Sequence, residues 1–240
     1  METEARGFIE SNPCEISLEY DPQRGDYIIR GHIVRLPPVR LGVILGDYIH
    51  NLRSALDHLV WQLVLVEDNT PGKWTEFPLF SSEPNFRSKV EAPRRRGKES
   101  PLLGVGDRAF AIIKSCQPYH PPPEPGAVNI LSVLHKFSNI DKHQLVHVGL
   151  VRFTDGAPKF TIKGIDTLRI GLTSGPLENG AEWGRVIVCP SDDDTDMEVS
   201  GSLPVDLRFG EQALPRRRLQ TLNNAVVTVV DKLGPFAELS

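Results

Sequence analysis

The feature that most constrains the fold of this chain is an unbroken helical period between Gly46 and Val66. At about 100° per residue, the apolar side chains of this stretch fall on one broad face, which predicts a helix packed against a core. That face comprises Ile49, Leu52, Ala55, Leu56, Leu59, Val60, Leu63 and Val66. The opposite face carries His50, Asn51, Arg53, Ser54, Asp57, His58, Trp61 and Gln62. A solvated helix face usually carries Lys and Glu, so this composition indicates a site or an interface.

A second helical pattern runs from about residue 127 to residue 142, again with one apolar face. Polar side chains recur on its other face at spacings of three and four: His135, Asn139, Lys142 and His143. If this face and that of the first helix meet, they surround one cleft with groups suited to phosphate binding and acid–base work. We therefore predict that the two polar faces share a cavity.

Beyond Gln144 the hydrophobic period changes to two, and short runs are divided by Gly, Pro and Asp. This pattern predicts an antiparallel meander, to which an N-terminal hairpin over residues 14–36 contributes. The fold class that follows is α+β, with a bundle of about four helices packed with an antiparallel β-sheet. Because the last helix follows the strands, we expect one interleaved domain over residues 1–240. Its helical core covers about 41–143 and 215–233, and its β-rich part covers 14–36 and 145–210.

The composition limits the classes of function. A formal charge of −4 over 240 residues gives no global field for nucleic acid or an anionic membrane, so any such binding is local. Cys14, Cys116 and Cys189 are odd in number and far apart, which argues against a disulfide framework. The N-terminus lacks signal-peptide features and no apolar run approaches a membrane span, so we expect a cytoplasmic protein of bacterial type, without a membrane partner.

The first helix contains the sequence Arg53-Ser-Ala-Leu-Asp-His58, which has the pattern R-x-x-x-x-H. In spacing, helical setting and the polar residue after the arginine, it resembles the signature of the HEPN superfamily, helical-bundle domains many of which are metal-independent ribonucleases of toxin and defence systems. The resemblance covers residues 46–143. It implies that Arg53 holds the scissile phosphate and that His58 moves a proton for attack by the ribose 2′-hydroxyl. Asp57 and Asn51 complete the predicted catalytic set.

Helix geometry adds a constraint on this pair. Five positions correspond to about 500°, so Arg53 and His58 leave the helix axis roughly 140° apart. A second copy about a two-fold axis would let Arg53 of one copy meet His58 of the other, and a homodimer is therefore expected. HEPN nucleases resemble this in forming dimers with a shared cleft. A structural alternative pairs Arg53 with Asp57 at i,i+4 and leaves His58 as a surface or interface histidine.

Two further functions compete with an RNA-directed one. A non-catalytic binding or assembly module would use Trp61, His50 and Asn51 as a dimer or partner interface. A metal-dependent hydrolase would use His135 and His143 with Asp57 as ligands, although no pair has a recognised zinc spacing, so no metal or cofactor is predicted.

Arginine runs supply the candidate contacts to RNA phosphates. They are Arg94, Arg95 and Arg96, in a predicted basic loop over residues 93–98, and Arg216, Arg217 and Arg218, at the start of the last helix. Simple solvation of these arginines is the alternative.

Overall fold

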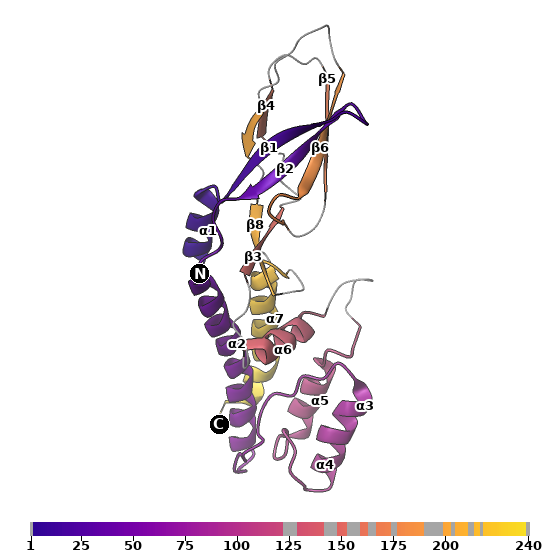
Figure 1. Cartoon of the computed structure of the whole chain (residues 1–240). Helices are drawn as coiled ribbons and strands as arrows, with labels where there is room; N and C mark the ends of the chain where they lie inside the picture. Colours follow the sequence, from indigo (N-terminus) through magenta and orange to yellow (C-terminus); the bar gives the residue numbers. More distant parts are fainter. Residues whose placement is uncertain are drawn as a thin grey trace. The chain divides into compact units, whose positions relative to one another are not determined.

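The computed structural model (Figure 1) is a mixed α+β protein, which confirms the predicted fold class. It describes residues 2–121, 129–141, 148–152, 159–162, 167–173, 177–189, 199–202, 205–210, 214–216 and 218–238. The chain divides into two compact units, each assembled from two separated stretches: residues 1–44 with 147–216, and residues 45–146 with 217–240. We refer to them as the β unit and the helical unit. The bundle of about four helices and the single interleaved domain stay predictions.

The β unit begins with helix α1 (Glu2–Glu10) and the hairpin of β1 (Cys14–Asp21) and β2 (Asp26–Ile33), as predicted from the alternating pattern. Gly25, at φ +69°, supplies the left-handed conformation of the turn, and its N–H donates to the Asp21 carbonyl at 2.8 Å. The hairpin joins β6 (Glu182–Cys189) and β5 (Thr167–Leu172) in an antiparallel sheet of order β1-β2-β6-β5. The N-terminal hairpin therefore pairs with the later β-rich region, as expected.

The later strands are nested, and the predicted meander is wrong. β3 (Val148–Arg152) pairs with β8 (Val205–Phe209), β4 (Lys159–Ile162) pairs with β7 (Val199–Ser202), and β5 pairs with β6, all antiparallel. The short β9 (Leu214–Pro215) adds to β8. Each partner lies further out along the chain than the pair inside it, whereas a meander pairs consecutive strands. Alternation fixes which residues face a core, but it does not fix the partner of a strand.

A close approach of backbone and indole fixes the sheet at Gly31. Trp183 is 2% exposed, and a Cβ added at Gly31 would lie 1.7 Å from its ring. Next to this contact the β2–β6 register shifts between Ile29 and Arg30. Glycine is required here because any side chain would overlap the ring.

The helical unit contains most of helix α2 (Val39–Leu65), which begins in the β unit and enters the helical unit at Leu45. A nearly continuous helical segment follows, comprising α3 (Glu83–Phe86), the π-helical turn η1 (Arg87–Glu91) and α4 (Ala92–Arg95). The unit is completed by α5 (Asp107–Ser115), α6 (Ile130–Asp141), α7 (Arg218–Leu233) and the short 3-10 turn η2 (Gly234–Phe236). The predicted basic loop over residues 93–98 is wrong in its first part, because residues 93–95 belong to α4.

The π-helical turn has an identifiable cause in Pro93. Proline has no N–H, and its ring collides with the carbonyl four residues earlier in a regular α-helix, here that of Lys89. The wider turn just before it, in which the Ala92 N–H donates to the Arg87 carbonyl, accommodates the proline without ending the helix.

The segment Phe77–Phe80 has no regular structure and is anchored by two polar side chains. Asp57 of α2 accepts the Phe77 N–H at 2.8 Å. The fully buried Gln117 accepts the Phe80 N–H at 3.1 Å and donates to the Pro78 carbonyl at 2.8 Å. Buried backbone groups outside helices and sheets need such partners, so Asp57 and Gln117 hold this segment in place.

Candidate functional site

Helix α2 buries one side in the helical unit and leaves the other exposed. Ile49, Leu56 and Val60 are fully buried, as their period predicts. The exposed residues between Leu45 and Leu65 are Asp47, His50, Asn51, Ala55, His58, Trp61, Gln62 and Leu65, and we call this set the α2 stripe. It contains no Lys, Arg or Glu, and Trp61 is 44% exposed. Depletion of charge together with an exposed tryptophan is typical of an interface.

Arg53 lies beside the α2 stripe, with its side chain 13% exposed. Its Nη2 is 3.0 Å from Asp57 Oδ1 and 3.8 Å from Glu76 Oε2, while Nη1 is buried without a hydrogen-bond partner. The i,i+4 pair of the structural alternative is therefore confirmed. Because the same Asp57 oxygen accepts the Phe77 N–H, the pair also fastens the Phe77–Phe80 segment to α2.

His58 and Asn51, two other members of the predicted catalytic set, are exposed in the α2 stripe. His50, also in the stripe, has its Nε2 3.4 Å from the hydroxyl of Ser54. His58 thus faces solvent, whereas the guanidinium of Arg53 is held in an ion pair. One α2 helix does not bring Arg53 and His58 onto the same ligand, as their angular separation predicts.

The second predicted cluster lies on α6 only in part. His135 is half-buried, and its Nε2 is 3.2 Å from Asn139 Nδ2, one turn later on the same helix. Lys142 and His143 lie outside the described residues. The named contacts of the two polar faces each join residues four apart on one helix, so a cavity shared by α2 and α6 stays a prediction.

Metal and thiol chemistry find little support in the part of the chain that the structure describes. Within it, no group of three or more His, Cys, Asp or Glu side chains is placed to hold a metal ion. Cys14 and Cys116 are free thiols, and burial raises the pKa of both, that of Cys14 to about 11. Such thiols are poor nucleophiles at neutral pH, because the thiolate is the reactive form.

The predicted RNA-binding arginines have different environments. Arg94 is 19% exposed, donates through Nη2 to the Val105 carbonyl at 2.6 Å and to Asp107 at 2.8 Å, and stacks over Phe110. It therefore connects α4 to α5 and is not available to a ligand. Arg216 is 2.9 Å from the buried Asp206 in the β unit.

The other four arginines of that set are Arg95, Arg96, Arg217 and Arg218. Arg95, Arg96 and Arg218 are exposed. Arg217 lies outside the described residues.

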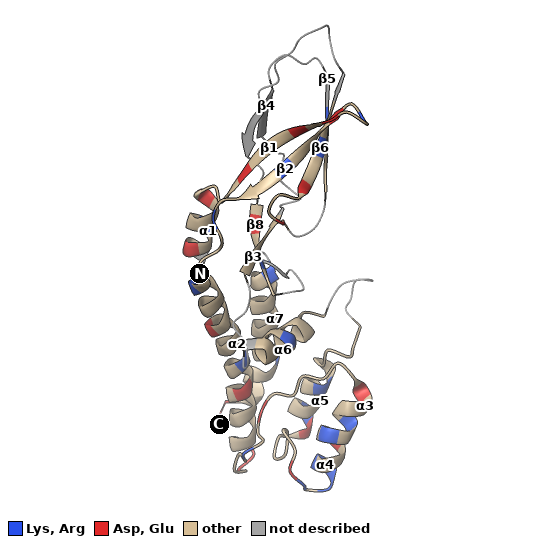
Figure 2. Cartoon of the chain, viewed as in Figure 1, with Lys and Arg blue, Asp and Glu red and all other residues tan. Residues whose placement is uncertain are grey.

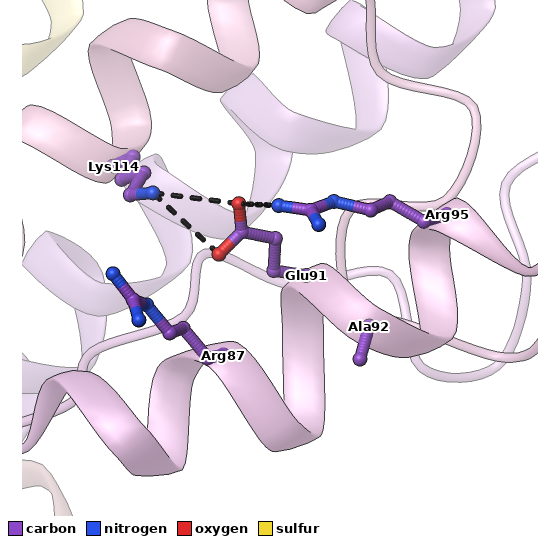
Figure 3. A pocket seen from close by; sticks show the side chains of 5 residues that line it. All are labelled: Arg87, Glu91, Ala92, Arg95 and Lys114. Carbon is purple, nitrogen blue, oxygen red and sulfur yellow. Dashed lines mark hydrogen bonds and ion pairs between the residues drawn. The ribbon is translucent and has the colours of Figure 1, made fainter.

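Arg95 lines a cavity of about 350 Å³ together with Arg87, Glu91, Ala92 and Lys114; we call it the Glu91 pocket. Figure 3 shows the Lys114 ammonium and the Arg95 guanidinium on the Glu91 carboxylate, with the Arg87 guanidinium turned toward the same space. The Nζ of Lys114 lies 3.4 and 3.5 Å from the two Glu91 oxygens. Three cations against one carboxylate give the lining a net charge of +2.

Glu91 is ionised at neutral pH although its side chain is only 11% exposed. Burial, the largest single influence, raises its pKa, but the hydrogen bond from Arg95 and the charge of Lys114 outweigh burial and hold the pKa below its usual range. The carboxylate therefore acts as a fixed negative anchor for two of the three cations.

Sequence reasoning missed Arg87, Glu91 and Lys114. A signal was present, because Glu83, Arg87, Glu91 and Arg95 alternate in sign at spacings of four. Such a ladder is typical of a helix with i,i+4 ion pairs. The structure contains both pairs, Arg87 with Glu83 at 2.8 Å and Arg95 with Glu91.

Among all described helices, none is both long and apolar enough to cross a bilayer. No protein-family model, curated protein or solved structure matches the chain.

Proposed function

We propose that this chain is a HEPN-like RNA-directed protein that works as a homodimer through the α2 stripe, with RNA cleavage as its activity. The observation that supports this best is the exposure of His58 at the centre of a helix face that lacks Lys, Arg and Glu. Such a face is poorly designed for bulk water and suits a second protein surface. The proposal includes the predicted four-helix bundle, a cytoplasmic location and a role in bacterial toxin or defence systems.

In this proposal His58 is the general acid–base group. An imidazole accepts the proton of the ribose 2′-hydroxyl, which attacks the adjacent phosphorus, and the 5′-oxygen departs with a proton. The products are a 2′,3′-cyclic phosphate and a free 5′-hydroxyl. Arg53 stabilises the charge on the phosphoryl oxygens, for which its guanidinium must leave Asp57 or share its remaining N–H donors.

A second copy completes this arrangement. Arg53 and His58 point about 140° apart on one helix, so they meet only when another α2 supplies one of them. The α2 stripe contains one acidic residue, Asp47, and no basic residue other than histidine, so two copies can pack together with little like-charge repulsion.

The test is an RNA cleavage assay in EDTA. Purified protein should cut single-stranded RNA and leave 2′,3′-cyclic phosphate ends, whereas His58→Ala should not. Equal cleavage by both proteins, or by neither, contradicts the nuclease assignment.

A non-catalytic binding or assembly module is the second candidate, and the state of Arg53 favours it. The guanidinium is paired with Asp57 and Glu76, and Asp57 is needed by the Phe77 N–H. In this candidate Arg53 is structural, and Trp61, His50 and Asn51 form the interface. Loss of the dimer in Trp61→Ala, together with an RNA pool that stays intact with the unmodified protein, would favour this candidate over the nuclease.

A further inference from the structure

The Glu91 pocket is lined almost wholly by charged side chains, with Ala92 as its only apolar residue. Pockets for small organic ligands are mostly apolar with a few polar groups. A lining of three cations and one carboxylate offers no such surface and instead selects for negative charge.

The cations in this pocket keep donors for an occupant. Arg87 and Arg95 are 65% and 70% exposed, and each bonds its carboxylate through Nη2. A guanidinium has five N–H donors, so most of them stay free. Lys114 is held only by long contacts of 3.4 and 3.5 Å, which a stronger acceptor can replace at little cost.

Charge outside the pocket indicates a polyanion as the occupant. Residues 81–120 contain eight Lys and Arg against four Asp and Glu, a net of +4 in a chain of net −4, so the rest of the chain carries a net of −8. Figure 2 shows this concentration of Lys and Arg on α3, α4 and α5. Exposed cations outside the pocket belong to the same segment: Lys89, Arg96, Lys98 and Arg108. A free phosphate needs no such field, whereas a phosphodiester chain benefits from it.

We infer that the Glu91 pocket holds a backbone phosphate of RNA, with Arg87, Arg95 and Lys114 as its donors. This inference rests on RNA being the substrate in the proposed function, and it gives RNA a contact site separate from His58. Glu91 orients Arg95 and Lys114 from behind and keeps the phosphate on the solvent side of the cations.

The test measures the binding of a fluorescent single-stranded RNA of about 12 nucleotides by anisotropy, between about 20 and about 200 mM salt, in EDTA. All proteins carry His58→Ala, so the RNA stays intact. Arg87→Gln and Lys114→Gln should each weaken binding about fivefold at 0.1 M salt and reduce the slope of log K against log salt by about 0.7, as for one lost phosphate contact. Arg24→Gln, in the exposed β1–β2 turn, removes the same charge elsewhere and should change neither quantity.

Affinities and salt slopes of Arg87→Gln and Lys114→Gln that equal those of Arg24→Gln would overturn the inference. So would a protein that binds no RNA at low salt, or one that binds inorganic phosphate but not RNA. Pocket-dependent RNA binding without cleavage by the unmodified protein would remove the nuclease proposal and leave this inference standing. Cleavage with a KM unaffected by Arg87→Gln would do the reverse.

Discussion

Two exposed surfaces of the helical unit differ sharply in charge. The α2 stripe has Asp47 as its single acidic residue and no Lys or Arg, whereas residues 81–120 contain twelve charged side chains with a net of +4. An uncharged face can meet its own copy without repulsion, and a positive one attracts a polyanion. We therefore expect self-association and proton transfer at α2, and capture of RNA at the Glu91 pocket.

The largest effect that separates the two surfaces is on cleavage. His58→Ala should lower the cleavage rate by a factor of about 10² to 10⁴, the usual contribution of a general acid–base group, and should change RNA affinity by less than about twofold. Single-turnover cleavage and anisotropy measure the two quantities. His50→Ala, an exposed histidine of the same stripe, is the matched control and should cost less than about tenfold. An equal loss in both variants would deny His58 its chemical role.

Next in size is an effect on association. Trp61→Ala should raise the dissociation constant of the dimer about 30-fold, as expected when a buried aromatic hot spot worth about 2 kcal/mol is truncated. Trp74→Ala is the control, because Trp74 is 53% exposed and lies outside the stripe, where its indole N–H donates to Glu99. Sedimentation analysis of both variants decides the matter. Dimers of unchanged strength in Trp61→Ala would place the interface elsewhere.

A smaller effect concerns the charge of the pocket. Glu91→Gln raises the net charge of the lining from +2 to +3, so RNA affinity at 0.1 M salt should rise by about two- to fivefold through reduced repulsion. The same change should not alter the dissociation constant of the dimer. Weaker RNA binding in Glu91→Gln would mean that the orienting role of the carboxylate outweighs its charge.

The smallest effect is on stability in acid. The folded-state pKa of Glu91 is lowered, so its pairing contributes stability above the ordinary carboxyl pKa, and that contribution is lost as the pH falls through the lowered value. Because Arg95 is largely exposed, the contribution at neutral pH should be below about 1 kcal/mol. Urea unfolding of the unmodified protein and Glu91→Gln should differ at pH 7 and converge in acid. A difference that grows as the pH falls would have the wrong sign.

The sequence predicted the parts of this fold that depend on local periodicity. The core face of α2 follows the 3.6-residue period over many turns, and the N-terminal hairpin follows alternation. The errors on α2 lie at the edges of the face, where Ala55 is exposed and Val64, which was not assigned to the core, is fully buried. A residue at the edge of a stripe is buried or exposed by its neighbours in space, which a period does not specify.

The helix at residues 83–95 was missed for a chemical reason. Two prolines and three consecutive arginines are typical of a loop, and the ion-pair ladder that favours a helix was overlooked. Pro84 is in the first turn, where no N–H is needed, and the π-helical turn accommodates Pro93.

Burial also distinguishes arginines that look alike in the sequence. Arg94 and Arg95 are neighbours in one run, yet Arg94 is enclosed by Val105, Asp107 and Phe110 while Arg95 is 70% exposed at a pocket. The partners of Arg94 come from a segment more than ten residues away. Only the tertiary structure separates the structural arginine from the available one.

The central claim, that Arg53 of one copy works with His58 of another, is tested most directly by mixing two inactive variants. Arg53→Ala and His58→Ala, combined in equal amounts and allowed to exchange subunits, should form mixed dimers in half of the population, each with one intact site of two. RNA cleavage should therefore recover to about a quarter of the unmodified rate. A mixture that stays as inactive as its two components would contradict the claim.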